Sequence, residues 1–281
     1  MRAAISLYAN LNTQNPHPKK VGNTFGYIHE ISDFCPNHPT LSIMKTRNII
    51  AASLLAGAIF TSCQEPIVKE KEALTPVTFE KVTLQDQFWL PRLKTQKQTL
   101  VPFALEKAQP AVENLRRTGE YLKTGQGKLE NLPRYVASDL FKVMEGAACL
   151  LTIEKDPELE KQMDEIIDII ADAQKPDGYL YEWFSAPSKK PNGWGAGDKP
   201  YSFVVHSHEL YNMGHMYEGA VAYYRATGKR KWLDVAEKNA RHINKVFFEG
   251  DPAYNDGKPV MQAPGHEEIE LALVKLYQTT G

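Results

Sequence analysis

The clearest pattern in the chain lies between His206 and Gly228, where two sets of side chains recur at helical spacing. The first set is apolar: Leu210, Met213, Tyr217, Ala220 and Tyr224. The second is polar at its start and small at its end: His208, Tyr211, His215, Gly219 and Ala222. Apolar residues three and four positions apart mark the core face of a helix. A surface helix would carry Lys and Glu on its other face, so imidazoles and a phenol there predict an inner helix with one end open to a cavity.

The same design occurs twice more along the chain. Val143–Ala148 reads like Met216–Val221, and Val274–Gly281 reads like Val221–Gly228. Amphipathic second helices follow two of the copies, with apolar positions at Leu159, Met163, Ile166, Ile170 and Ala173, and at Trp232, Val235, Ala236, Ala240 and Ile243. The repeating unit is therefore a helical hairpin. Unequal spacing between the copies predicts long loops on one side, and about six long helices in all.

Turn and capping residues give the expected boundaries of the other elements. Loose alternation over 77–88 predicts one or two short strands, and a helix follows from Pro91 to about residue 115. A polar loop is expected over 114–131. Ser138 and Asp156 are candidate N-caps of the next two helices, and the second of these must end before Pro176. Long loops are expected over 185–200 and 250–264, and a last helix opens at Gly265.

The N-terminal region has the order of segments found in a bacterial lipoprotein signal. A basic start at residues 44–47 precedes an apolar run over 49–60 that is too short to span a bilayer, and Cys63 follows small residues. We expect residues 44–62 to be a signal peptide, Cys63 to be lipidated, and residues 63–76 to be a tether. Because a signal should begin a chain, residues 1–43 are expected to be a spurious or disordered extension. The alternative is a short buried helix with a chance cysteine.

Charge and cysteine content limit the kinds of partner and metal site that we expect for this chain. The formal net charge is −1, and no basic stripe interleaves with aromatic residues, so no nucleic-acid partner is expected. Three cysteines form no disulfide framework, and no Cys/His spacing suggests zinc. The His208-Glu209 pair begins like a zinc-binding HExxH helix, but the position four residues after His208 is Asn212. No metal site is predicted in this chain.

The histidines are the strongest candidates for a binding site. His208 and His266 open corresponding inner helices, and equivalent ends of alternate helices meet on one side of a ring of hairpins. We therefore expect both imidazoles at a common mouth, in the neutral form favoured at a helix N-terminus, where they can bind sugar hydroxyls. His215, two turns further along, should face the cavity wall. Each histidine taken alone is better explained by ordinary packing, and only the three at corresponding sites make a binding site an equally good explanation.

Aromatic residues and carboxylates add less specific candidates. Tyr179 and Trp194 lie on or beside the 185–200 loop with other aromatic rings, and they either stack on a sugar or cover the end of the bundle. Most glycoside hydrolases use a pair of carboxylates. No pair stands out by spacing, and Glu218 recurs as Glu145, which suggests a structural role. No residue of this chain is assigned to catalysis.

Several motifs together resemble glycoside hydrolase family 127, the bacterial β-L-arabinofuranosidases. They are Asp177-Gly178-Tyr179-Leu180, His208-Glu209-Leu210-Tyr211 with Gly214-His215, Ala226-Thr227-Gly228-Lys229, and Pro264-Gly265-His266 followed by Glu270-Leu271-Ala272-Leu273. The resemblance covers about residues 79–281 and implies an (α/α)6 barrel. On its terms residues 77–281 are the N-terminal part of a catalytic domain, and the chain is truncated.

The resemblance also implies chemistry. The family releases β-L-arabinofuranose from plant glycans with retention, using a cysteine nucleophile in a zinc-thiolate cluster and a glutamate acid/base, all downstream of the last motif here. His208 and His266 match family histidines near the sugar, and His215 and Glu209 carry over with them. Cys35, Cys63 and Cys149 match no family cysteine. This chain is therefore expected to be inactive alone and to hold no zinc, which belongs to the full-length protein.

Two other functions stay open. A non-catalytic helical-repeat lipoprotein could bind glycan or protein on the bacterial cell envelope, in the periplasm or on the outer membrane. Another (α/α)6 enzyme, such as an unsaturated glucuronyl hydrolase, would have the same architecture. In every case the membrane is contacted only through the lipid anchor.

Overall fold

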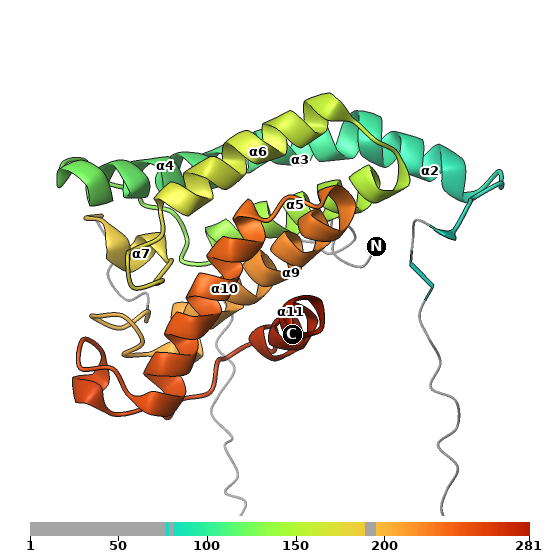
Figure 1. The fold of residues 1–281 in the computed structure, drawn as a ribbon. Helices are drawn as coiled ribbons and strands as arrows, with labels where there is room; N and C mark the ends of the chain where they lie inside the picture. The colour runs from blue at the N-terminus through green and yellow to red at the C-terminus, as the bar shows by residue number, and fades with distance from the viewer. Residues whose placement is uncertain (1–76, 79–80, 189–194) are drawn as a thin grey trace, which may run out of the picture. The chain divides into compact units, whose positions relative to one another are not determined.

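The computed structural model describes residues 77–78, 81–188 and 195–281, which belong to one unit of the chain. Three inner helices carry the repeated design: α5 (Val136–Ile153), α9 (Glu209–Thr227) and α11 (Ile269–Thr280). Helix α9 packs against α5 on one side and α11 on the other (Figure 1). Small residues on these helices allow the close packing that puts α9 at the centre, with most of its residues buried.

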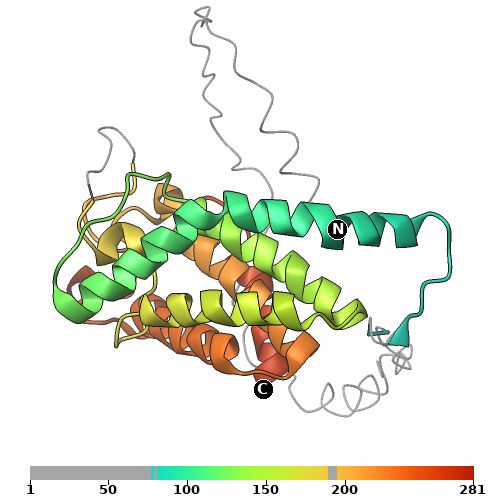
Figure 2. The same ribbon diagram turned by 90° about the horizontal axis from the view of Figure 1, so that it is seen from above.

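Three outer helices cover the inner ones: α4 (Gln109–Thr124), α6 (Pro157–Asp172) and α10 (Lys231–Asn244). Helix α6 packs against α4 and α10. Figure 2 shows α4 and α6 lying over the inner helices, and Figure 1 shows α10 in front of α9. Their buried positions include Met163, Ile166 and Ile170 on α6, and Trp232 and Ile243 on α10. Both predicted apolar stripes therefore face the core, as helical periodicity requires.

Shorter elements complete the described part. An almost continuous helical stretch leads into α4 and consists of α2 (Trp89–Thr95), the π-helical η3 (Gln96–Leu100) and α3 (Val101–Lys107). The remaining elements are α7 (Glu182–Ser185), α8 (Val204–Ser207), the π-helical η4 (Lys245–Glu249) and the 3-10 turn η5 (Asn255–Gly257). The described residues 186–188 and 195–200, and the segment 250–264 with η5 inside it, lie in connections where the sequence predicts loops.

The all-α prediction of paired inner and outer helices is confirmed, and the short β start is wrong. No strand is present in the described residues of segment 77–88. Val77 and Val82 are 66% and 49% exposed. An alternating segment becomes a strand only where a second strand pairs with it, and none of the described segments does so.

Helix boundaries differ from the predictions at three places. Helix α4 continues to Thr124 through half of the expected loop. Helix α5 begins at Val136, so Ser138 lies in its first turn and donates its hydroxyl to the Tyr135 carbonyl instead of capping. Helix α11 begins at Ile269, four residues after Gly265. The Asp156 cap is confirmed, because its carboxylate accepts a hydrogen bond from the Leu159 amide at 3.1 Å.

Close contacts between inner and outer helices depend on glycine. A Cβ placed on Gly219 of α9 would lie 2.5 Å from the ring of Trp232, which is fully buried. Gly265 passes the backbone of α8 so closely that a Cβ would lie 2.0 Å from the Val205 carbonyl oxygen. That contact sets the path of the segment leading into α11.

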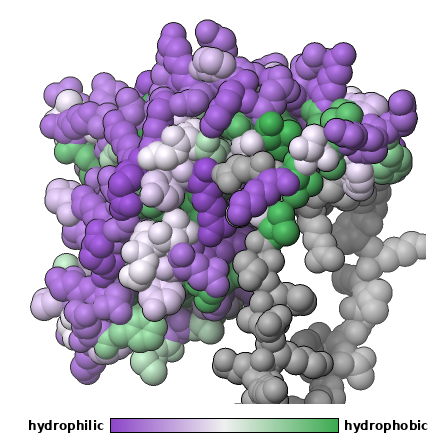
Figure 3. Space-filling view, turned by 45° about the vertical axis from the view of Figure 1, so that its right-hand side comes forward, coloured by the Kyte–Doolittle hydropathy of each residue, from purple (hydrophilic) through white to green (hydrophobic). Residues whose placement is uncertain are grey.

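The surface and the N-terminal region complete the description. The face drawn in Figure 3 is mostly hydrophilic, with smaller hydrophobic patches. Among the described helices, none combines the length and the hydropathy needed to cross a membrane. The predicted extension, signal peptide and tether, including Cys63, lie outside the described residues.

Candidate functional site

The N-terminal ends of the three inner helices meet, and each brings a ring to the same place. His208 is the N-cap of α9, Tyr135 is the N-cap of α5, and His266 lies three residues before α11. The His208 ring centroid lies 5.0 Å from that of His266 and 5.6 Å from that of Tyr135. The expectation that the two imidazoles lie together is confirmed. His266 is exposed and His208 is half-buried, so both can reach a ligand.

The backbone and charge around His208 fix how its ring is presented. His208 has φ 63° and ψ 14°, a left-handed conformation that turns the chain sharply from α8 into α9. Arg134 Nε donates to His208 Nδ1 at 3.0 Å. Burial lowers the pKa of His208, and the nearby Arg134 and His266 lower it further. The His206 carbonyl, 2.8 Å from Nδ1, opposes this shift. A neutral ring that accepts from Arg134 at Nδ1 carries its proton on Nε2, and one that donates from Nδ1 to the His206 carbonyl has an accepting Nε2; either tautomer leaves Nε2 able to bond a hydroxyl group.

Tyr211 is a member of this site that the sequence analysis places on the polar stripe of the helix but does not assign to binding. Its ring centroid lies 5.2 Å from His266, 5.7 Å from His208 and 4.6 Å from His215. Its hydroxyl lies 2.7 Å from Lys142 Nζ on α5. The signal was present, because Tyr211 stands three residues after His208 on the same polar stripe. We call His208, His266, Tyr211 and Lys142 the histidine cluster.

Glu209 and Tyr179 lie elsewhere. Both are 1% exposed, and the Tyr179 hydroxyl donates to Glu209 Oε1 at 2.6 Å. The Tyr201 amide also donates to the Glu209 carboxylate, at 3.1 Å. These groups are satisfied by one another in the interior, so they hold the 201–209 segment in place and do not line the histidine cluster. Trp194 lies outside the described residues.

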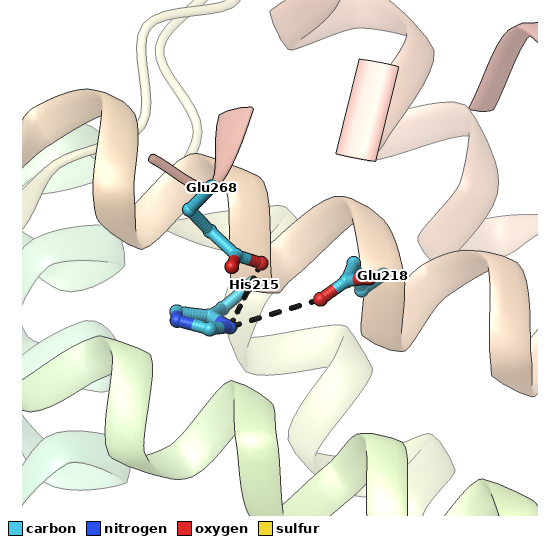
Figure 4. Close-up of side chains that lie close together, drawn as sticks. All are labelled: His215, Glu218 and Glu268. Carbon is cyan, nitrogen blue, oxygen red and sulfur yellow. Dashed lines mark ion pairs between the residues drawn. The ribbon is translucent and has the colours of Figure 1, made fainter. Parts of the chain in front are cut away.

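His215 lies behind the histidine cluster in a second group of polar side chains. Its Nδ1 is 3.0 Å from Glu268 Oε1 and 4.0 Å from Glu218 Oε2 (Figure 4). Lys275 Nζ of α11 contacts Glu218 Oε1. We call His215, Glu218 and Glu268 the carboxylate–imidazole triad. No sequence prediction paired these residues, although His215 and Glu218 stand one helical turn apart.

Two carboxyl groups of the triad have opposite pKa shifts. Burial raises the pKa of Glu218 to about 7, with the neighbouring Glu268 and Glu145 adding to the effect of burial. Burial alone would also raise the pKa of Glu268, but the neighbouring His215, Glu218 and Lys275 bring it below its usual range.

The described residues do not fit a zinc-thiolate cluster. Cys149 on α5 is a free, half-buried cysteine, and burial next to Glu145 raises the pKa of its thiol. A zinc-binding cysteine needs a lowered pKa and further thiolates beside it. No step of a reaction is assigned to Cys149.

The chain is similar to known β-L-arabinofuranosidases over most of its length. Residues 81–281 match the family model described as β-L-arabinofuranosidase, glycoside hydrolase family 127 catalytic domain. A non-reducing end β-L-arabinofuranosidase of Bifidobacterium longum subsp. longum is 34% identical over 217 residues, which cover 71% of this chain and 32% of the relative.

Solved structures give the same result. The family 127 β-arabinofuranosidase BT3674 is 36% identical, with a TM-score of 0.64, over 73% of this chain and 31% of the other. The family 127 β-L-arabinofuranosidase Ara127N-Se of Geobacillus stearothermophilus T6 is also 36% identical, with a TM-score of 0.59, over 71% and 30%. The chain thus spans about a third of the length of these relatives.

Proposed function

Because the chain belongs to the glycoside hydrolase family 127 β-L-arabinofuranosidases, we propose that it is the sugar-binding N-terminal part of an enzyme that removes terminal β-L-arabinofuranose from a plant-type glycan. The observation that carries the proposal is the 5.0 Å separation of the His208 and His266 rings where the inner helices begin. The Bifidobacterium longum relative, which aligns with 71% of this chain, is named for the same reaction.

The histidine cluster suits a furanose ring. His208 and His266 supply nitrogens that bond hydroxyl groups, and Lys142 adds an ammonium beside the Tyr211 hydroxyl. The Tyr135 and Tyr211 rings provide apolar surface beside these groups. A small number of convergent polar groups among aromatic rings is typical of sites for small polar ligands.

The bond-breaking groups belong to another part of the proposed enzyme. We propose a retaining mechanism in which the cysteine nucleophile, its zinc cluster and the glutamate acid/base come from the part of the relatives' length that this chain does not span. This chain then contributes binding and orientation of the terminal sugar. By itself it binds the sugar weakly and hydrolyses nothing.

Hydrolysis of p-nitrophenyl β-L-arabinofuranoside by the full-length gene product tests the proposal. We expect release by that protein and none by the 281-residue chain, with the β-anomer as the first product by NMR. His208→Ala and His266→Ala should each lower kcat/KM by roughly ten- to a hundred-fold, the cost of about 1–3 kcal/mol for an unmade buried hydrogen bond. Release from unsaturated uronides but not from the arabinoside would contradict the arabinofuranosidase reaction and favour an unsaturated glucuronyl hydrolase. No release from either would favour a binding module.

We further propose that the protein is a cell-envelope lipoprotein anchored through Cys63. The order of basic start, apolar run and cysteine supports this. Metabolic labelling with a radioactive fatty acid in a bacterial host should label the wild type and not Cys63→Ser, with Cys149→Ser as the labelled control. A labelled Cys63→Ser variant would contradict the anchor site.

A further inference from the structure

The carboxylate–imidazole triad has the composition of a metal site. His215 and Glu218 project from the same face of α9, one turn apart, and Glu268 approaches from the residue before α11 (Figure 4). One ligand atom from each, an imidazole nitrogen and two carboxylate oxygens, lie within 4.8 Å of one another. Zinc binds this combination of nitrogen and oxygen ligands, and a histidine and a glutamate three residues apart on a helix reach one ion in helical metalloproteins.

Buried polar atoms at the triad lack hydrogen bonds. Three buried atoms have no hydrogen-bond partner among the described groups: the two ring nitrogens of His215 and Glu268 Oε1. The His215 and Glu268 side chains are only 12% and 13% exposed. His215 Nδ1 lies 3.0 Å from Glu268 Oε1 without the alignment of a hydrogen bond. An unsatisfied buried polar group is costly, and a bound ion is one established reason for it.

The charge around the triad favours a cation. Three carboxyl groups face one another here, because Glu145 of α5 interacts electrostatically with Glu218, Glu268 and His215. The ammonium group that faces them is that of Lys275, which contacts Glu218 Oε1. Glu218 Oε2 is the oxygen turned toward His215, so the contact with Lys275 leaves a ligand atom for an ion. One ammonium faces three carboxyl groups, and a bound cation would stabilise their ionised forms.

We propose that His215, Glu218 and Glu268 bind a divalent transition-metal ion of the zinc class, separate from any thiolate cluster. The ion joins α9 to the segment before α11. A Cβ on Gly214 would lie 2.9 Å from the backbone carbonyl carbon of Glu268, so the two backbones already lie close together where the ion would join them. Because His266 stands two residues before Glu268, the same ion fixes His266 against His208.

Zinc titration of the chelator-stripped 281-residue chain by calorimetry tests the proposal. We expect one Zn²⁺ per chain and a rise in Tm with Zn²⁺, and neither in His215→Ala or Glu268→Gln. Glu267→Gln, an exposed neighbour, is the matched control and should bind like the wild type. His208→Ala/His266→Ala should also bind one ion, which separates the triad from the histidine cluster.

Folding and metal class are checked in the same samples. Circular dichroism of each variant establishes that loss of binding is not loss of the fold, and Co²⁺ as a second probe should give a visible absorption spectrum that Glu268→Gln abolishes. A folded wild type that binds no Zn²⁺ would overturn the proposal. So would one-to-one Zn²⁺ binding that survives in folded His215→Ala and Glu268→Gln, or binding of Ca²⁺ or Mg²⁺ in place of Zn²⁺.

Discussion

Two glycines at matched positions of the repeated inner helix have opposite surroundings. Gly219 of α9 faces the Trp232 ring, where a Cβ would meet carbon atoms at 2.5 and 2.9 Å. Gly146 occupies the same place in α5, and a Cβ there would meet nothing within 4 Å. The same motif therefore serves close packing in one copy and leaves open space in the other.

Alanine at each of these glycines should change stability in opposite directions. Gly219→Ala forces Trp232 to move and should cost about 1–3 kcal/mol, as overpacking of a core does. Gly146→Ala should stabilise by up to about 1 kcal/mol, because alanine is the better helix former. Urea unfolding followed by circular dichroism measures both. Equal effects of the two substitutions would show that the Trp232 contact does not limit the packing.

A buried carboxyl group makes stability depend on pH. Burial raises the pKa of Glu182, at the start of α7, to about 7. Since its pKa is higher in the folded chain than in the unfolded chain, the folded chain binds the extra proton, and stability is full below the unfolded pKa of about 4.5 and falls as pH rises toward 7. Glu182→Gln removes the charge and should flatten this fall by up to about 3 kcal/mol. Free energies of unfolding at pH 4.5 and 8 test it, and identical slopes for both proteins would contradict it.

Individual site residues were predictable where they follow helical symmetry. His208 and His266 were placed together because both precede inner helices of one repeat. Glu209 follows His208 directly, yet it points to the interior and pairs with Tyr179. Sequence adjacency does not tell which side of the turn a residue faces, and the left-handed conformation of His208 decides it here.

At the scale of the element, helix ends depend on local capping. Asp156 precedes Pro157 and accepts from the Leu159 amide, so it satisfies one of the free N–H groups of α6. This cap was readable from the sequence because Asp at the N-cap with Pro next to it is a strong local signal. The start of α11 was not, because its position follows from the passage of Gly265 over Val205.

Removing the cap of α6 should be measurable. Asp156→Ala should lower the free energy of unfolding by about 1 kcal/mol, and Asp156→Asn by much less, because asparagine also caps. Thermal unfolding of the two variants makes the comparison. Equal losses would mean that the ion pair between Asp156 and Lys97, and not the cap, stabilises this helix start.

For the whole molecule, the order of helices was predictable and the polar interior was not. Hydrophobic periodicity indicates paired inner and outer helices, and family 127 structures align with the chain at TM-scores of 0.64 and 0.59. The carboxylate–imidazole triad joins residues 53 positions apart, from Glu268 back to His215. No local pattern marks such a pairing, since it depends on how α11 packs against α9.

The central claim is that the meeting ends of the inner helices hold a furanose between His208 and His266. The most direct measurement is a titration of the chain with methyl β-L-arabinofuranoside, followed by NMR of the imidazole signals assigned by substitution. We predict that the His208 and His266 signals shift together and saturate, while His242, which is 3% exposed, stays in place. Shifts at other histidines with His208 and His266 unmoved, or no shift at millimolar sugar, would contradict the account.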